Sequence, residues 1–152
     1  MTRPDAIARR AARVIVLDAT DRVLLLHGYD PARPEHRYWF TVGGGLDPGE
    51  SGSEAAAREL FEETGLRVAP SAFAEPVWRD HDEFQLDGRW YRQDQEFYVI
   101  RADAFEVDSA GFSDLERRSV DGHRWWSVGE LRATTERFYP PDLPDRLLRL
   151  TC

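Results

Sequence analysis

The chain has 152 residues, of which 41% are hydrophobic, and these can supply the core of one domain over residues 1–152. Its net charge of −8 excludes a general affinity for DNA, RNA or an anionic membrane, because no basic stripe offsets the repulsion from phosphate groups. Without a long apolar span or a signal-peptide pattern, the chain is expected to be soluble and cytoplasmic.

The first part of the chain predicts three strands that lead to a glycine run. Residues 1–10 show no clear pattern and are expected to be flexible, although residues 7–13 would also suit a short helix. A loop is expected over residues 30–34, and Gly43 to Gly45 form either a turn or a backbone that approaches a metal or phosphate. Alternating apolar residues and turn signals place the strands at residues 12–17, 23–26 and 38–42.

A short helix is predicted after the glycines. Ser51 with Glu54 three residues later forms a capping box, and Gly65 supplies a left-handed stop. At about 100° per residue, one side of this helix is acidic and the other faces a core. The core side is expected to consist of Ala57, Leu60, Phe61 and Thr64.

The acidic side of the helix predicts a metal site. Glu59, Glu62 and Glu63 lie one turn apart, where like charges destabilise a helix by roughly 0.2–0.5 kcal/mol per pair. Three glutamates alone would also describe a solvated surface. A bound cation would offset the repulsion, and oxygen ligands suit Mg²⁺ or Mn²⁺. We therefore expect one of these ions at the three glutamates, approached by the backbone of Gly44.

The second half of the chain predicts further strands and a terminal helix. Asp87-Gly88 marks a two-residue hairpin turn. Strand-like pieces are expected over residues 66–78, a loop-rich connection over 102–122, and an amphipathic helix over 142–150. Strands are expected on both sides of the hairpin turn up to residue 100, and over residues 123–128. Because strands and helices do not alternate regularly, the fold class is α+β, with a mixed sheet flanked by helices.

The stretch from Gly44 to Leu66 resembles the Nudix box at every specified position. It reads Gly44, five residues, Glu50, seven residues, and then Arg58-Glu59-Leu60-x-Glu62-Glu63-x-Gly65-Leu66. The resemblance implies an α/β/α sandwich and metal-dependent hydrolysis of a diphosphate linkage, with water attacking phosphorus. It also implies that Glu59 and Glu63 are the principal metal ligands and that Glu62 is a further ligand or the base.

Further acidic and basic residues are candidates for the catalytic machinery. Arg58 either orients the carboxylates or forms a surface ion pair, and Glu50 is expected to fix the loop. Relatives of this kind commonly add a later acidic residue as base or ligand. Glu116 is favoured over Glu96 for that role, because a tryptophan-containing strand follows it. The base itself stays open among Glu59, Glu62 and Glu63 of the box and the later acids Glu116 and Glu96.

The substrate is a small nucleotide that the sequence does not specify further. Aromatic and arginine residues outside the box could stack a base or hold a phosphate, although core packing is the commoner use of such aromatics. The residues proposed to contact substrate are Arg79, Arg92, Trp39 and Glu96. The segment after the box departs from the patterns of ADP-ribose and dinucleoside polyphosphate hydrolases.

Three functions remain open. The leading one is a nucleotide pyrophosphohydrolase, and the second is a non-catalytic Nudix module that senses a nucleotide. An isoprenoid diphosphate isomerase, which by resemblance uses an internal cysteine, is disfavoured because Cys152 is terminal. We expect neither a nucleic acid polymer nor a membrane as partner, and a homodimer is compatible with the sequence. The basic residues are all arginine, which indicates a GC-rich, bacterial coding sequence.

Overall fold

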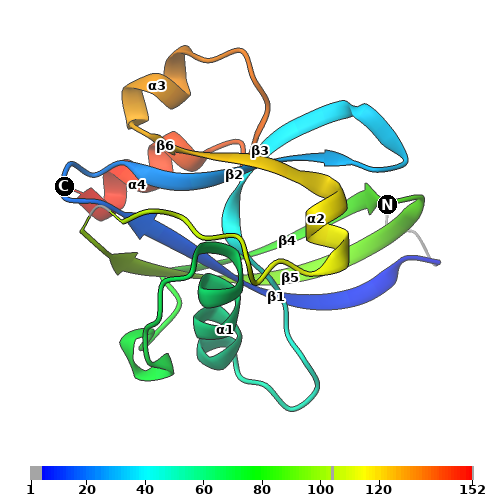
Figure 1. Ribbon diagram of the computed structural model, residues 1–152, viewed down its shortest axis with the longest axis horizontal. Coiled ribbons are helices and arrows are strands. Elements are labelled where there is room, and N and C mark those ends of the chain that lie inside the picture. The colour runs from blue at the N-terminus through cyan, green and yellow to red at the C-terminus, as the bar shows by residue number, and fades with distance from the viewer. Residues whose placement is uncertain (1–4, 104, 152) are drawn as a thin grey trace.

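The computed structural model describes residues 5–103 and 105–151, and it places a mixed sheet between two layers of helices (Figure 1). The strands are β1 (Ile7–Leu17), β2 (Val23–Asp30), β3 (Arg33–Gly45), β4 (Trp78–Leu86), β5 (Arg89–Arg101), β6 (Val120–Trp126) and β7 (Phe138–Tyr139). The helices are α1 (Gly52–Thr64), α2 (Asp114–Ser119), α3 (Val128–Ala133) and α4 (Leu143–Thr151), with a 3₁₀ turn at Pro70–Ala72. No helix in these described ranges is long and apolar enough to cross a membrane.

The sheet has the order β4-β5-β1-β2-β3-β7, and β6 pairs with β2. β1 pairs in parallel with β5 along its whole length, while its middle, residues 11–14, also pairs antiparallel with the glycine end of β3. These pairings bring the start of the chain, the glycine run and the middle of β5 together at one place. The functional site described below lies there.

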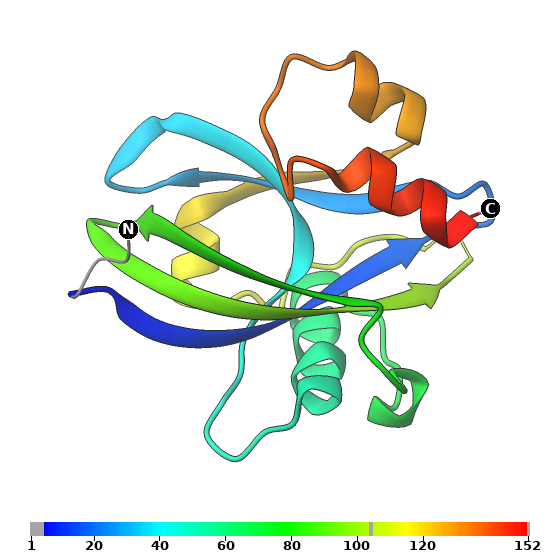
Figure 2. The same cartoon turned by 180° about the vertical axis from the view of Figure 1, so that it is seen from behind.

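Each face of the sheet packs against its own helices, and two hydrophobic clusters result. Between the sheet and α1, the cluster includes Val14, Leu26, Leu60 and Tyr98. On the opposite face, α3 and α4 cover a second cluster that includes Leu17 and Trp126. Figure 2 shows α4 in front of the sheet and α1 behind it. The predicted sandwich of helices around a mixed sheet is therefore confirmed.

Several local predictions are confirmed by the backbone. The three early strands lie within β1, β2 and β3, and the terminal helix corresponds to α4. Both halves of the Ser51 capping box form, and Gly65 ends α1 with φ of 80°. Asp87 and Gly88 have φ of 53° and 79°, as the hairpin turn between β4 and β5 requires.

Other local predictions are wrong because distant pairing outweighs local pattern. Residues 7–13 form a strand instead of a short helix or a flexible segment, since they join β5 in parallel from the Ile7–Tyr91 pair onward. The expected loop over 30–34 is shorter, because β3 already begins at Arg33. Residues 66–77 contain the 3₁₀ turn and no strand. Phe61 is 36% exposed instead of buried, and the Arg67 guanidinium lies 4.0 Å from the centre of its ring.

Two short helices were missed, although the sequence carries their start signals. Ser113 with Glu116 and Ser127 with Glu130 are both capping boxes, at the start of α2 and α3 respectively. The expected loop-rich connection over 102–122 therefore contains α2. The predicted strand over 123–128 begins earlier, at Val120, and ends where the second box starts α3.

Candidate functional site

Two glutamates of α1 face the glycine end of β3. Glu59 and Glu63 lie one helical turn apart and are 7% and 1% exposed. The backbone N–H of Gly43 donates a hydrogen bond of 2.6 Å to Glu63 Oε1. At Gly44, an added Cβ would lie 2.6 Å from Glu59 Oε1, so only glycine lets the strand approach this carboxylate. The glycine run is thus extended backbone that contacts the acidic side of the helix.

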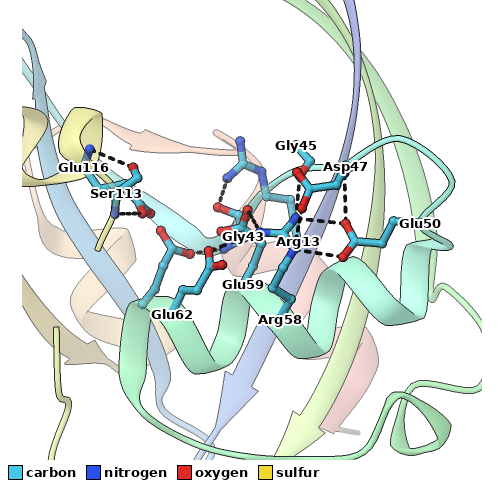
Figure 3. A network of polar contacts seen from close by, with 11 residues as sticks. Arg13, Gly43, Gly45, Asp47, Glu50, Arg58, Glu59, Glu62, Ser113 and Glu116 are labelled. Atoms are coloured by element: carbon cyan, nitrogen blue, oxygen red, sulfur yellow. Dashed lines mark hydrogen bonds and ion pairs between the residues drawn. The ribbon is translucent and has the colours of Figure 1, made fainter. Parts of the chain in front are cut away.

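A third carboxylate reaches the same place from α2. Ligand oxygens of Glu59, Glu63 and Glu116 all lie within 4.8 Å of one another, and we call these three residues the acidic cluster. The Ser113 N–H donates to Glu116 Oε1 at 2.9 Å, so the capping box fixes one oxygen of this carboxylate. In Figure 3, Glu116 extends from α2 toward the carboxylates of α1.

Burial and mutual repulsion shift the proton affinities of the acidic cluster. Burial raises the pKa of the Glu59 carboxyl to about 7, with Arg58 opposing the shift and Glu116 adding to it. Burial also raises the pKa of Glu63 well above its usual range, and a hydrogen bond shared with Glu116 adds to this shift. For Glu116, burial acts in the same direction, but the hydrogen bonds with Glu63 and Ser113 outweigh it and lower the pKa.

The acidic cluster fits a divalent cation. Its ligand atoms are carboxylate oxygens, which suit hard cations such as Mg²⁺ and Mn²⁺. Without a cation, Glu59 and Glu63, buried beside Glu116, retain protons at a pH where free glutamate is ionised. The raised pKa values of Glu59 and Glu63 therefore indicate an arrangement that a cation would stabilise.

Arg58 connects the acidic cluster to the loop before α1. Its guanidinium donates to both oxygens of Glu50, at 2.8 and 2.9 Å, and to the carbonyl of Gly45 at 2.9 Å. Its remaining nitrogen donates to Glu59 and to Glu62, each at 3.1 Å. Figure 3 shows Arg58 between these two groups of acceptors. The contacts of Glu50 thus match the loop-fixing role expected for it.

Arg13 holds the other side of the glycine run. Its guanidinium donates to the carbonyl of Gly43 and to Gln95 Oε1, both at 3.0 Å. Since the N–H of Gly43 binds Glu63, hydrogen bonds fix the peptide groups on both sides of this glycine. The position of Glu63 is therefore coupled to a buried glutamine on β5.

The acidic cluster opens into a cleft of about 1000 Å³. Arg9 and Arg13 from β1 lie in its wall, next to the carboxylates. Farther away, the rings of Tyr38, Phe40 and Tyr139 contact one another at centroid distances of 5.6 and 5.7 Å and also line the cleft. The cleft therefore has an acidic end, adjacent cations and an aromatic wall, a distribution suited to a nucleotide.

The structure separates the predicted catalytic residues into two groups. Glu59, Glu63 and Glu116 come together, with Gly44 beside them, whereas Glu62 lies at the edge and binds Arg58. Glu96 belongs to the opposite face of β5, where it accepts from Arg10 and from the Tyr98 hydroxyl at 3.1 Å. It is not among the residues that line the cleft.

The residues proposed to contact substrate lie on the strand faces that point away from the cleft. Trp39 packs on Trp126 and donates to Glu136, while its neighbours Tyr38 and Phe40 line the cleft. Arg79 and Arg92 are not in the lining either, and Arg79 lies 3.9 Å from Glu96 on the other face. Side chains alternate along a strand, so a one-residue error in phase exchanges the two faces.

Sequence reasoning missed the polar residues of the cleft floor. Arg9, Arg13, Gln93 and Gln95 lie on β1 and β5 and line the cleft. The alternation along β5 did group Gln93 with Gln95, but nothing in the sequence identified this face as the one toward the box. The parallel pairing of β1 with β5 decides it.

Comparisons with known proteins agree with this geometry. A model of the NUDIX domain matches residues 8–145. The chain is 32% identical over 120 residues to an RNA pyrophosphohydrolase of Rhizobium meliloti (strain 1021), covering 72% of each protein. It is also 32% identical over 137 residues to an RNA pyrophosphohydrolase of Rhodopseudomonas palustris (strain BisB18), covering 82% of this chain and 78% of that one. The crystal structure of a MutT protein from Methanosarcina mazei Go1 superposes with a TM-score of 0.69 at 18% identity, over 98% and 99% of the two chains.

The acidic cluster should make the metal-free protein less stable as the pH rises. A carboxyl whose pKa is higher in the folded than in the unfolded state stabilises the fold while it is protonated. This contribution is complete below the unfolded pKa and is lost as the pH rises through the folded pKa. For Glu59, these limits are 4.5 and about 7, so the free energy of unfolding should fall by about 3 kcal/mol across that window.

Thermal unfolding in chelator between pH 5 and pH 8 measures this effect. Glu59→Gln should flatten the profile, whereas Glu75→Gln, at an exposed position, should leave it unchanged. A melting temperature that stays constant or rises over this range in the unmodified protein would contradict the raised pKa.

Proposed function

The chain belongs to the Nudix hydrolase family, and from that membership we propose that it splits a diphosphate linkage in a nucleoside triphosphate or another nucleoside diphosphate derivative. Residues 1–152 would act as one catalytic unit. The observation that carries the proposal is the acidic cluster at the end of a nucleotide-sized cleft. A module that only senses nucleotides would have no need to bury two glutamates beside a third.

Glu59 and Glu63 are the residues proposed to hold Mg²⁺ or Mn²⁺. A divalent cation bound there would neutralise charge on the phosphate oxygens and lower the pKa of a coordinated water. Arg58 keeps Glu59 in place from one side, and the Gly43 N–H keeps Glu63 in place from the other. Glu62 has a supporting role in this proposal, because its carboxylate binds Arg58.

Glu116 is the residue proposed to accept the proton of the attacking water. As the water oxygen bonds to phosphorus, the bond from phosphorus to the leaving phosphate oxygen breaks, and the water proton passes to the Glu116 carboxylate. The capping bond between Glu116 and Ser113 holds the carboxylate in position, so little reorganisation is needed.

Arg9 and Arg13 are proposed to bind the phosphates of the substrate. Both line the cleft next to the acidic cluster, and guanidinium groups match phosphate geometry well. Local cations of this kind reconcile an anionic substrate with a net charge of −8. The sensing module remains a weaker alternative because binding alone would not need the whole set of buried glutamates, and the isomerase remains one because Cys152 is terminal.

The 5′ end of an RNA is a second candidate substrate. The observation in its favour is the name of the two relatives compared above, which are both RNA pyrophosphohydrolases and are matched over more than two thirds of their length. The net negative charge argues for recognition of the terminal nucleotide alone, without a long contact with the RNA backbone.

A substrate panel tests the proposal. Nucleoside triphosphates, ADP-ribose, a nucleotide sugar, a dinucleoside polyphosphate and a 5′-triphosphorylated RNA are incubated with the protein and Mg²⁺ or Mn²⁺, and the released phosphate or monophosphate is measured. At least one should be hydrolysed, and excess chelator should abolish turnover. Glu63→Gln should lose activity but keep its fold by circular dichroism. Full activity in chelator, or a fully active Glu63→Gln variant, would contradict the proposal.

The role of Glu116 is tested against Glu96, which lies on the opposite face of the sheet. Glu116→Gln should lower kcat by roughly 10²–10⁴-fold with little change in KM, because the interaction forms mainly as the proton leaves. Glu96→Gln is the matched control and should have a mild effect. Steady-state kinetics at saturating metal provide both constants. Small effects of both variants would assign the base to Glu62 or Glu63 instead.

A further inference from the structure

Three side chains form a row across the cleft floor, perpendicular to the strands. Arg9 on β1 is the register partner of Gln93 on β5, and Gln93 is the register partner of Asp82 on β4. All three line the cleft. Neighbouring strands lie about 4.8 Å apart, so Gln93 and Asp82 are spaced to contact neighbouring groups on one edge of a nucleobase.

Gln93 is the unusual member of this row. It is 1% exposed, and its Oε1 has no hydrogen-bond partner among the residues that the structure describes. Buried polar atoms nearly always have a partner, and an exception at a cleft wall indicates a missing water or ligand. Asp82 beside it is exposed toward the cleft and therefore accessible.

The next row of the sheet shows how the protein satisfies similar groups internally. Gln95 accepts a hydrogen bond from Arg13, and Asp80 accepts one from Arg146 at 2.9 Å. These two residues are register partners, as Gln93 and Asp82 are. In the row of Gln95 and Asp80, both side chains thus accept hydrogen bonds from arginines. In the row of Gln93 and Asp82, the carboxamide oxygen of Gln93 has no donor among the described residues.

An aromatic pair borders the row on its other side. Phe84 and Tyr91 are register partners one step farther along β4 and β5, and their rings stack at 5.4 Å with an interplanar angle of 21°. Phe84 belongs to the cleft lining. A planar ligand that reached the polar row would therefore have an apolar surface beside it.

We propose that Asp82 and Gln93 form a base-recognition subsite that selects guanine. This inference rests on the proposed function, because it assumes that the cleft binds a nucleotide whose phosphates lie at the acidic cluster. Arg9 extends from the row toward the glycine run, where its Nε would lie 3.0 Å from a Cβ added at Gly45. It thus separates the base subsite from the phosphate end.

The arrangement of donors and acceptors favours guanine over other bases. The exocyclic amino group and the ring N–H of guanine are adjacent donors, so the Asp82 carboxylate can accept from the amino group while the unpartnered Gln93 Oε1 accepts from the ring N–H. Adenine offers the carboxylate only its amino group. Hypoxanthine keeps the ring N–H and the carbonyl but lacks the amino group.

The comparison of GTP with ITP isolates this contact, because the two differ only in the amino group of the base. In the unmodified protein, kcat/KM should be roughly ten- to hundredfold higher for GTP, as expected for one hydrogen bond to a charged group. In Asp82→Asn, one acceptor oxygen becomes a donor, and the GTP to ITP ratio should approach one. Gln93→Leu should lower kcat/KM for both nucleotides, since both carry the ring N–H.

Asp94→Asn is the matched control. Asp94 follows Gln93 on β5 but points to the opposite face, where it binds His81 at 2.8 Å and is 74% exposed. This variant should keep the ratio of the unmodified protein. Thermal melts show whether each variant folds. If Gln93→Leu does not fold, the Asp82→Asn variant is sufficient to test the inference.

Binding in chelator distinguishes failure of this inference from failure of the proposed function. GTP and ITP affinities are measured by calorimetry without divalent metal, where no turnover is expected. A GTP preference that Asp82→Asn removes supports the subsite, even if no nucleotide is hydrolysed. Equal affinities and equal kcat/KM values for GTP and ITP, or a ratio that Asp82→Asn leaves unchanged, would overturn it.

Discussion

Repulsion among three carboxylates is the constraint on which the rest of this site depends. Glu59, Glu63 and Glu116 come from two helices that lie far apart in the sequence, and their oxygens lie within 4.8 Å of one another. Two of the three side chains are buried, so water screens little of the repulsion. Such a cluster persists only if the surrounding structure fixes each carboxylate separately.

The surrounding contacts do fix them, and each acts from a different element. The backbone N–H of Gly43, at the end of β3, donates a hydrogen bond to Glu63, and the N–H of Ser113, which caps α2, donates one to Glu116. Arg58 holds Glu59 and ties it to Glu50 in the loop that precedes α1. These contacts surround the acidic cluster. A cation between the three carboxylates would therefore have the strongest effect on the stability of the fold and on the chemistry of the site.

The sequence predicted the parts of this arrangement that are local. The capping box at Ser51, the stop at Gly65 and the acidic side of the helix follow from spacing within a few residues. The cleft floor could not be predicted in the same way. Its side chains face the site because β1 pairs in parallel with β5, a contact between residues more than 80 positions apart. The face of the sheet on which Trp39 and Arg79 lie could not be predicted for the same reason, because the pairing of distant strands sets the register.

The central claim is that the acidic cluster is a divalent metal site, and anomalous diffraction from crystals grown with Mn²⁺ tests it directly. We expect an anomalous peak within bonding distance of carboxylate oxygens of Glu59 and Glu63, with Glu116 on the same side. Peaks only elsewhere, for example at the exposed edge of Glu62, or no peak at a saturating Mn²⁺ concentration, would contradict it.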